Sequence, residues 1–263
     1  MNRQDAGWAA QPFFGKVVVV TGARGEIGLQ TAEELAKRGA TVWAADIGFS
    51  AAEAPRSFGA GIIHPVQLDV TDSHAVDSLF RSITSDSGPI SMLVNAAGGP
   101  GTDRSLVEDV TDEQWHKVVS LNLDGAFYCC RAAAQSMKSG GAGGSIVNIS
   151  SGAGRTYSRT GVQAYAAAKA GVIGLTRQLA REMGTYGVRV NCVAPGLIAV
   201  EGLAKELSSI SSEAMQIHLS GVALGRLGSA ADLVGPIVFF LGPEAGYVTG
   251  QTISVDGGST MLG

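Results

Sequence analysis

The chain has 263 residues, of which 45% are hydrophobic, and it carries a formal net charge of −4. This length and apolar content suit one α/β domain with a sizeable core. The acidic balance disfavours nucleic acid or an anionic membrane as the main partner. No apolar run approaches the ~20 residues that a membrane span requires.

The N-terminal stretch, residues 1–13, lacks the apolar centre of a signal peptide. We therefore expect a flexible tail there and a cytoplasmic location. The three cysteines fit buried, reduced thiols better than a disulfide framework. The four histidines show no ligand spacing with one another, so we assign no metal site.

The first elements of the chain form a pattern that is typical of dinucleotide binding. Residues 17–20 are four valines, which predict a buried parallel strand. A glycine-rich turn over 21–28 follows and leads into a helix that continues to about residue 38. Such a turn places free backbone N–H groups and a positive helix end where a pyrophosphate can bind. A second strand, 41–45, ends in Asp46.

Two residues in this region bear on the choice of dinucleotide. Asp46 can accept hydrogen bonds from the adenosine ribose, and its charge would repel a 2′-phosphate. Arg24 lies in the glycine turn and could instead reach a 2′-phosphate. We predict NAD, with NADP less favoured, because the Asp46 carboxylate is placed at the ribose itself.

Alternating helices and strands continue the pattern to the end of the chain. We predict helices over residues 51–58, 73–86, 111–137, 164–184 and 230–241. We predict the strands between them over residues 61–67, 90–94, 146–151, 188–193 and 251–255. The expected fold, over residues 14–263, is a single-domain α/β Rossmann fold. Its doubly wound, seven-stranded parallel sheet has the order 3-2-1-4-5-6-7, with helices on both faces.

The clearest catalytic signal is the pair Tyr165 and Lys169. The two residues are four positions apart in a predicted helix, so their side chains leave the same face. A neighbouring ammonium favours the phenolate and would lower the pKa of Tyr165 from about 10. The pair therefore predicts a general acid–base that works near neutral pH.

These motifs together resemble the short-chain dehydrogenase/reductase (SDR) family from about Gly15 to the C-terminus. Further matches follow in the family's order: Leu68-Asp69-Val70, Asn95-Ala96-Ala97-Gly98, Asn122, Ser151, Pro195-Gly196 and Val255-Asp256-Gly257-Gly258. The resemblance implies an oxidoreductase that transfers a hydride between NAD(H) and a secondary alcohol or ketone. It also implies a homotetramer.

The resemblance assigns roles to individual residues. Tyr165 would act as the general acid–base, Lys169 would hold the nicotinamide ribose, and Ser151 would orient the substrate oxygen. Asn122 would position a water that connects Lys169 to solvent, and Ser150 is the rival to Ser151. The implied cofactor-binding residues are Gly22, Arg24, Gly25, Ile27, Gly28, Asp46, Asp69, Val70, Asn95, Ala96, Ala97, Gly98, Tyr165, Lys169, Pro195, Gly196 and Ile198.

Two departures from the family pattern affect the cofactor site. Glu26 stands where the pattern TGxxxGxG has its middle glycine, and Gly25 comes one place earlier. We expect the Glu26 carboxylate to point away from the phosphates, since a carboxylate at contact range would cost about 1–4 kcal/mol. Val200 replaces a threonine whose hydroxyl often bonds the nicotinamide carboxamide. These departures leave open a nucleotide-binding family member without catalysis, and Arg24 leaves open an NADPH-dependent 3-oxoacyl-thioester reductase.

The substrate itself is not identified by the sequence. Residues 197–227 are expected to cover it as a mobile lid. Arg155, Tyr157 and Arg159 could meet an anionic or polar group, although solvated loop charges are the default. A secondary alcohol and its ketone are the narrowest substrate class that the residues indicate.

Overall fold

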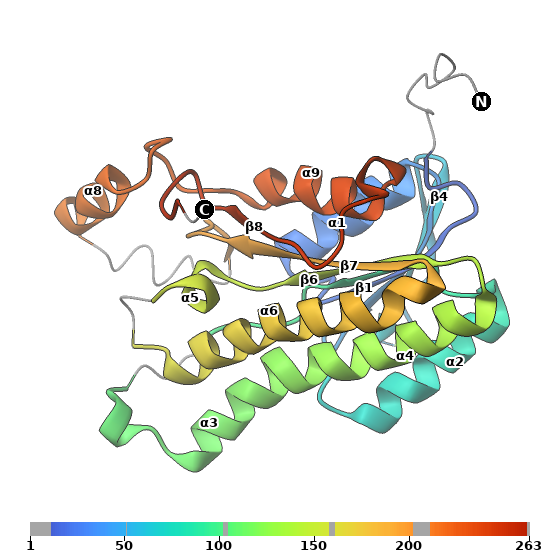
Figure 1. Cartoon of the computed structure of the whole chain (residues 1–263), viewed down its shortest axis with the longest axis horizontal. Coiled ribbons are helices and arrows are strands. Elements are labelled where there is room, and N and C mark those ends of the chain that lie inside the picture. Colours follow the sequence, from blue (N-terminus) through green and yellow to red (C-terminus); the bar gives the residue numbers. More distant parts are fainter. Residues whose placement is uncertain (1–11, 51, 102–104, 158–160, 202–210, 262–263) are drawn as a thin grey trace.

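One eight-stranded sheet with helices on both faces forms the framework of the protein (Figure 1). The computed structural model describes residues 12–50, 52–101, 105–157, 161–201 and 211–261. The strands are β1 (Val17–Thr21), β2 (Thr41–Asp46), β3 (Arg56–Phe58), β4 (Gly61–Gln67), β5 (Met92–Asn95), β6 (Gly144–Ile149), β7 (Val188–Pro195) and β8 (Thr252–Val255). Their spatial order is β3-β4-β2-β1-β5-β6-β7-β8. Seven of these strands are parallel and confirm the predicted order, while β3 is an additional antiparallel edge strand.

The helices of the described residues are α1 (Glu26–Lys37), α2 (Ser73–Ser87), α3 (Asp112–Val119), α4 (Gly125–Gly140), α5 (Gly152–Arg155), α6 (Gln163–Met183), α8 (Ser212–Ser220) and α9 (Ala230–Leu241). Helices α1 and α9 pack together on one face, and α2, α4 and α6 cover the other (Figure 1). No helix among the described residues is long and apolar enough to cross a membrane.

The four valines of β1 show why this sheet is apolar on both faces. Successive side chains of a strand point to opposite faces. Val18 and Val20 accordingly join the core under α1 and α9, together with Leu35 and Ile237. Val17 and Val19 join the core under α2, α4 and α6. A strand buried on both sides requires an unbroken hydrophobic run, which is the pattern of the sequence.

The predicted helix over 51–58 is wrong. This error explains why seven strands were predicted where the structure has eight. Of that range, residue 51 lies outside the described residues, and the end of the range forms β3, which pairs with β4 in a hairpin. Gly59 turns the chain with a φ of 63°, and a Cβ there would lie 2.6 Å from the Cα of Lys37. The hairpin therefore depends on a close approach to the end of α1 that only glycine allows.

The predicted helix over 111–137 is divided into three parts. Helix α3 and helix α4 are separated by one π-helical turn, Ser120–Asp124, which carries Asn122. The Asn122 side chain donates a hydrogen bond to the carbonyl of Val118 at 2.9 Å. A side chain that bonds the backbone in this way competes with the regular helical ladder, and single π-turns are often found at functional sites.

The two segments expected to be mobile are described only in part. Residues 1–11 of the predicted tail lie outside the described residues, but Phe13 is 1% exposed and belongs to the core, so the tail boundary at 13 is too late. Residues 202–210 of the predicted lid also lie outside them, and the lid's described remainder includes α8.

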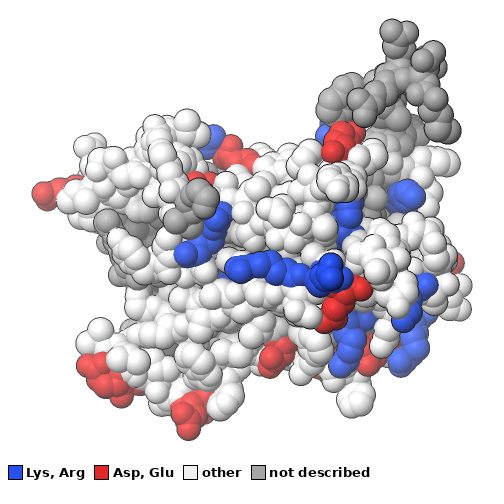
Figure 2. Space-filling model, in the orientation of Figure 1, with Lys and Arg blue, Asp and Glu red and all other residues white. Residues whose placement is uncertain are grey.

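Charge is unevenly spread over the face of the molecule that Figure 2 shows. In Figure 2, basic side chains gather over α6, where Arg177 and Arg181 are exposed. Acidic side chains gather around α3, whose first turn contains Asp112 and Glu113.

Candidate active site

The carboxyl ends of the parallel strands bring the predicted site residues to one edge of the sheet. The glycine turn follows β1, Asp46 ends β2 and Asn95 ends β5. Ser151 follows β6, and Pro195 ends β7. This edge is where ligands bind in open α/β sheets.

The glycine turn leaves room for a ligand at the start of α1. Gly22 has a φ of 65°, and a Cβ there would lie 2.6 Å from the backbone nitrogen of Ala97. Gly28 is buried against the backbone of Gly22, whereas a Cβ at Gly25 would make only an ordinary contact at 3.4 Å. Gly25 caps α1 without a side-chain hydrogen bond, so Ile27 and its neighbours in the first turn present backbone N–H groups.

Asp46 and Arg24 share one small region at the end of β2. The Asp46 carboxylate accepts hydrogen bonds from the backbone N–H groups of Arg24 at 3.1 Å and Gly48 at 2.9 Å. The Arg24 guanidinium donates to the carbonyl of Gly48 and lies over the Phe49 ring, 5.6 Å from its centroid. The Asp46 carboxylate, which favours NAD, and the Arg24 guanidinium, which favours NADP, therefore lie at the same site.

The segments after β4 and β5 contain residues that are buried in the fold and residues that are exposed at the site. Val70 is buried against Gly125, while Asp69 is exposed and accepts hydrogen bonds from the backbone and hydroxyl of Thr71. Asn95 is buried and donates to Asn148 at 2.9 Å. Ala96 and Ala97 are half-buried.

Gly98 lies at the centre of the catalytic groups. Its φ is 148°, and a Cβ there would lie 2.6 Å from Oδ1 of Asn122 and 3.0 Å from Nζ of Lys169. The neighbouring Gly99 is held by Asn122, which accepts from its N–H at 3.0 Å and donates to its carbonyl at 2.9 Å. The π-turn thereby fixes the loop after β5 beside Lys169.

Helix α6 places Tyr165 and Lys169 one turn apart, as predicted. Nζ of Lys169 lies over the Tyr165 ring, 5.6 Å from its centroid, and donates to the carbonyl of Ile149 at 2.9 Å. The Ser151 side chain is a hydrogen-bond partner of Tyr165. Ser151, Tyr165, Lys169 and Asn122 are thus brought together.

The electrostatics of the pair differ from the expectation. Burial raises the pKa of Tyr165 above its ordinary value, and only the Ser151 hydrogen bond opposes this rise. Burial also lowers the pKa of Lys169 to about 8. The expected lowering of the Tyr165 pKa by an adjacent ammonium is therefore wrong for this structure, because desolvation disfavours the charged form of both groups.

Ser150 and Ser151 have clearly different surroundings. Ser150 is buried, and its hydroxyl donates to the carbonyl of Lys169 at 2.7 Å, which ties β6 to α6. Ser151 is half-buried and caps α5, and its hydroxyl oxygen accepts from the N–H of Ala153 at 3.2 Å. Ser150 is therefore occupied by a structural contact, which leaves Ser151 as the better candidate.

A cavity of about 90 Å³ lies beside Tyr165, between α3 and the start of α6. Its walls include the apolar side chains of Val110, Val118, Leu121 and Val162, and the polar side chains of Gln114 and Lys117. The loop at Gly99 closes one side. An apolar group of modest size fits such a cavity.

Arg155 and Tyr157 are not among the described residues that line this cavity. Arg155 donates to the carbonyl of Thr252 at 3.2 Å and to the hydroxyl of Ser254 at 3.0 Å, so its guanidinium is bound to β8. Tyr157 is 75% exposed, and Arg159 lies outside the described residues. Arg155 is therefore not available to an anionic substrate group in this structure.

The loop after β7 is fixed by its backbone. Gly196 donates to the carbonyl of Val255 at 3.0 Å, and Ile198 is buried and forms a bridge with Gly228. Val200 packs against the apolar core. The Glu26 carboxylate accepts a hydrogen bond from the N–H of Glu201, so one of its oxygens is directed to this loop.

These features fit a nicotinamide dinucleotide. The open start of α1 suits a pyrophosphate, Asp46 suits a ribose, and the absence of a side chain at Gly98 leaves space next to Lys169. Within the described part of the chain, no group of three or more His, Cys, Asp or Glu side chains could hold a metal ion.

Comparison with known proteins places the chain in a family. A family model described as Enoyl-(Acyl carrier protein) reductase matches residues 22–260. A short-chain type dehydrogenase/reductase from Mycobacterium ulcerans superposes with a TM-score of 0.84 at 31% identity, covering 94% of this chain and 90% of that one. The chain is a short-chain dehydrogenase/reductase.

Two relatives of this SDR are named for their activities. The 3-oxoacyl-acyl-carrier-protein reductase FabG of Vibrio harveyi is 37% identical over 248 residues, which cover 94% of this chain and 98% of the relative. The (3R)-3-hydroxyacyl-CoA dehydrogenase of Homo sapiens is 36% identical over 256 residues, which cover 93% and 95%. The protein is accordingly an SDR oxidoreductase that acts on CH–OH groups with a nicotinamide cofactor.

Several residues that support the SDR site were not found from the sequence. Gly99 holds the Asn122 amide, and the Ile149 carbonyl holds Lys169. Both contacts use backbone atoms, which leave no residue-type signal. Asn148 and Thr176, which hydrogen-bond behind the site, could have been noticed as polar residues inside apolar elements.

Proposed function

We propose that the protein transfers a hydride between NAD(H) and a secondary alcohol or its ketone, with Tyr165 as the general acid–base. The single observation that carries this proposal is the convergence of Ser151, Lys169 and Asn122 around Tyr165. When bound, the nicotinamide ring supplies or accepts the hydride.

Each residue has a distinct task in this proposal. The Tyr165 hydroxyl gives a proton to the substrate oxygen during reduction and takes it back during oxidation. The Ser151 hydroxyl donates a hydrogen bond to the same oxygen and stabilises the charge that develops on it. The Lys169 amine, whose pKa is lowered to about 8 by burial, can pass a proton to Tyr165 near neutral pH. Asn122 keeps the loop at Gly99 in place and orients the path from Lys169 to solvent.

The proposed cofactor is NAD, because Asp46 presents a carboxylate that is fixed by two backbone N–H groups. A 2′-phosphate beside that carboxylate would be repelled. Gly22, Ile27 and Gly28 would surround the pyrophosphate, and Gly98, Lys169 and Ile198 would lie along the nicotinamide half. The flanking Arg24 supports NADP as the alternative.

A 3-oxoacyl thioester is the second candidate substrate. The names of the two relatives favour it, since one is a 3-oxoacyl-acyl-carrier-protein reductase and the other a (3R)-3-hydroxyacyl-CoA dehydrogenase. The cavity beside Tyr165 supports either candidate, because its walls are mainly apolar. The SDR resemblance also supports a homotetramer, which we propose as the working assembly.

The test compares the wild-type protein with Tyr165→Phe. Titration with NADH and NADPH, followed by nicotinamide fluorescence, should give at least about tenfold tighter binding of NADH, or about 1.4 kcal/mol. Tyr165→Phe should bind NADH within about twofold of wild type but lose about 10²–10⁴-fold in turnover of secondary alcohols and 3-oxoacyl thioesters.

Tyr186→Phe, which removes a hydroxyl from an exposed tyrosine beyond α6, is the matched control and should change neither quantity. Tighter binding of NADPH would replace NAD by NADP in the proposal. Substantial turnover by Tyr165→Phe would refute the role of Tyr165.

A further inference from the structure

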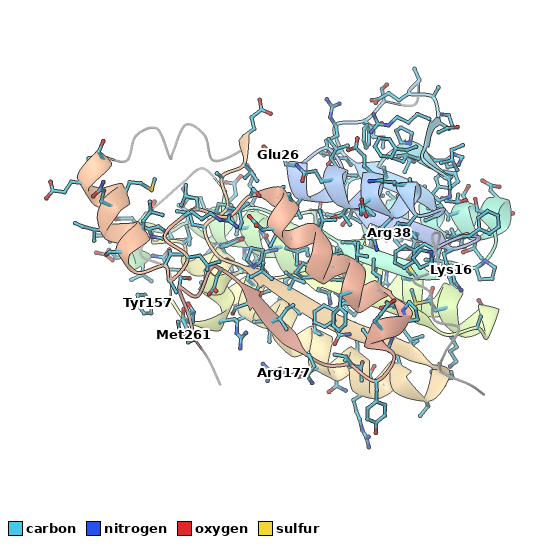
Figure 3. All side chains as sticks on the ribbon, turned by 90° about the horizontal axis from the view of Figure 1, so that it is seen from above. Lys16, Glu26, Arg38, Tyr157, Arg177 and Met261 are labelled. Carbon is cyan, nitrogen blue, oxygen red and sulfur yellow. The ribbon has the colours of Figure 1, made fainter. Side chains whose placement is uncertain are left out.

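Glu26 makes a contact that links two distant parts of the proposed cofactor site. It is the first residue of α1, and its carboxylate accepts a hydrogen bond from the backbone N–H of Glu201, 175 residues further along the chain. Figure 3 shows Glu26 at the N-terminal end of α1, next to the segment that follows β7. The contact therefore joins the glycine turn to the loop after β7.

The loop after β7 is anchored on its other side by separate contacts. Ile198 is buried and bridges to Gly228, and the N–H of Ala199 donates to the carbonyl of Gly228 at 2.8 Å. The backbone from Ile198 to Glu201 is thus held at both ends, by Gly228 on one side and by Glu26 on the other. Removing the Glu26 acceptor would release only the Glu201 end.

The residue at position 200 makes this second anchor important. Val200 packs against the core and has no hydroxyl with which to bind a cofactor amide. At position 200 the loop after β7 can therefore contact a dinucleotide only through its backbone, and the place of that backbone near α1 depends on the Glu26 contact. The charge of the Glu26 carboxylate disfavours an anionic ligand at the turn. Its hydrogen bond nevertheless holds the loop that lies beside the proposed cofactor site.

We propose that Glu26 is a positioning residue for the dinucleotide, which it serves by holding the backbone of Glu201 against the start of α1. This inference rests on the proposed cofactor site. Glu26 does not touch the reacting atoms, and its effect falls on the binding of the dinucleotide, not on the proton transfer at Tyr165.

The test separates the hydrogen bond from the charge. Glu26→Gln keeps an acceptor oxygen and removes the charge, whereas Glu26→Ala removes both. Because both variants lack the carboxylate charge, they differ in the acceptor oxygen. Glu26→Ala should therefore bind NADH about three- to tenfold more weakly than Glu26→Gln, which is the range expected for one hydrogen bond. The KM for NAD should rise by the same factor, while kcat should change by less than about twofold.

A second pair of variants removes the donor instead of the acceptor. Glu201→Pro lacks the backbone N–H, and Glu201→Ala retains it as the matched control. Glu201→Pro should weaken NADH binding as Glu26→Ala does, and combining the two should add little further loss, because both break the same bond. Glu33→Ala, elsewhere on α1, controls for loss of a negative charge from that helix and should leave NADH binding unchanged.

The inference would be overturned if Glu26→Ala and Glu26→Gln bound NADH equally, or if the losses from Glu26→Ala and Glu201→Pro added in full. A wild-type protein that bound neither NADH nor NADPH would instead refute the proposed function. The two failures are therefore distinguishable.

Discussion

Lys169 shows at the scale of one residue how the site works against the stability of the fold. The residue is 4% exposed, and among the described residues its amine donates one hydrogen bond, to the Ile149 carbonyl. Burial lowers its pKa to about 8, which corresponds to a destabilisation of about 3 kcal/mol for the charged form relative to the unfolded chain. The amine is kept where an apolar residue would be more stable, as is usual for functional sites.

We therefore expect Lys169→Met to be inactive but more stable than wild type at pH 7. The gain in the free energy of unfolding should be about 1–3 kcal/mol, since the Ile149 carbonyl loses its donor. Because the folded pKa lies below the unfolded value of about 10.4, the unfolded wild-type chain binds more protons between the two values. Wild-type stability should thus rise with pH from about 8, and the advantage of Lys169→Met should shrink.

Urea unfolding at pH 7 and near pH 10 measures this difference. An advantage that did not change with pH would mean that the methionine gains stability by packing and not by removing a buried charge.

The catalytic pair also marks how far sequence reasoning reaches. The spacing of Tyr165 and Lys169 was enough to place both on one helix face, because helical periodicity is local. Their pKa values were not accessible, since these depend on burial by segments far away in the chain. The Ser150 contact was invisible for the same reason: its partner is a backbone carbonyl.

At the scale of elements, a buried polar network ties α4 and α6 to the centre of the sheet. Asn148 on β6 donates to the hydroxyl of Thr176 at 3.0 Å and accepts from the Asn95 amide at 2.9 Å. The Cys130 thiol donates to the same Asn148 oxygen at 3.4 Å. All four residues are buried, so each hydrogen bond replaces one that water cannot supply.

Asn148→Leu should destabilise the protein by about 2–4 kcal/mol, because it leaves the Asn95 amide and the Thr176 hydroxyl with fewer partners in a dry site. Thr176→Val, which removes only one end of the network, should cost about 1 kcal/mol. Urea unfolding measures both differences. Equal stability of Asn148→Leu and wild type would show that the network contributes specificity without net stability.

Elements were predictable where their signal is local, and the two errors are tertiary in origin. The seven parallel strands and their order follow from apolar runs between helices. The hairpin at β3 depends instead on the approach of Gly59 to Lys37, and the π-turn depends on the bonds between Asn122 and Gly99. Neither contact can be read from the residues that form the element.

At the scale of the whole molecule, exposed aromatic side chains occur on helices of both layers. Trp115 and Phe127 are exposed on α3 and α4, two helices that lie below the sheet in Figure 1. Phe239 is exposed on α9, the helix that lies above the sheet, and Tyr247 is exposed in the turn that leads from it to β8. Two distinct self-complementary contacts, each with its own two-fold axis, generate a closed tetramer. This arrangement supports the proposed homotetramer.

Light scattering should accordingly give a mass four times that of the 26.8 kDa chain. Phe127→Lys should break one contact and Phe239→Lys the other, so that each variant forms dimers and the double variant monomers. A wild-type monomer would contradict the proposed assembly, and a tetramer that survives both substitutions would place the contacts elsewhere.

Arg155 has a consequence for how the protein behaves when it is concentrated. The Gln251 carbonyl accepts from the N–H of Cys192 on β7, so the next carbonyl, that of Thr252, faces the free edge of the sheet. Arg155 donates to that carbonyl and thereby occupies an acceptor that a strand from another molecule would need. At the opposite edge, β3 is only three residues long and offers little backbone to pair with. Both edge strands of the sheet, β3 and β8, are thus poor templates for pairing with a strand of another molecule. This property protects the folded protein from aggregation.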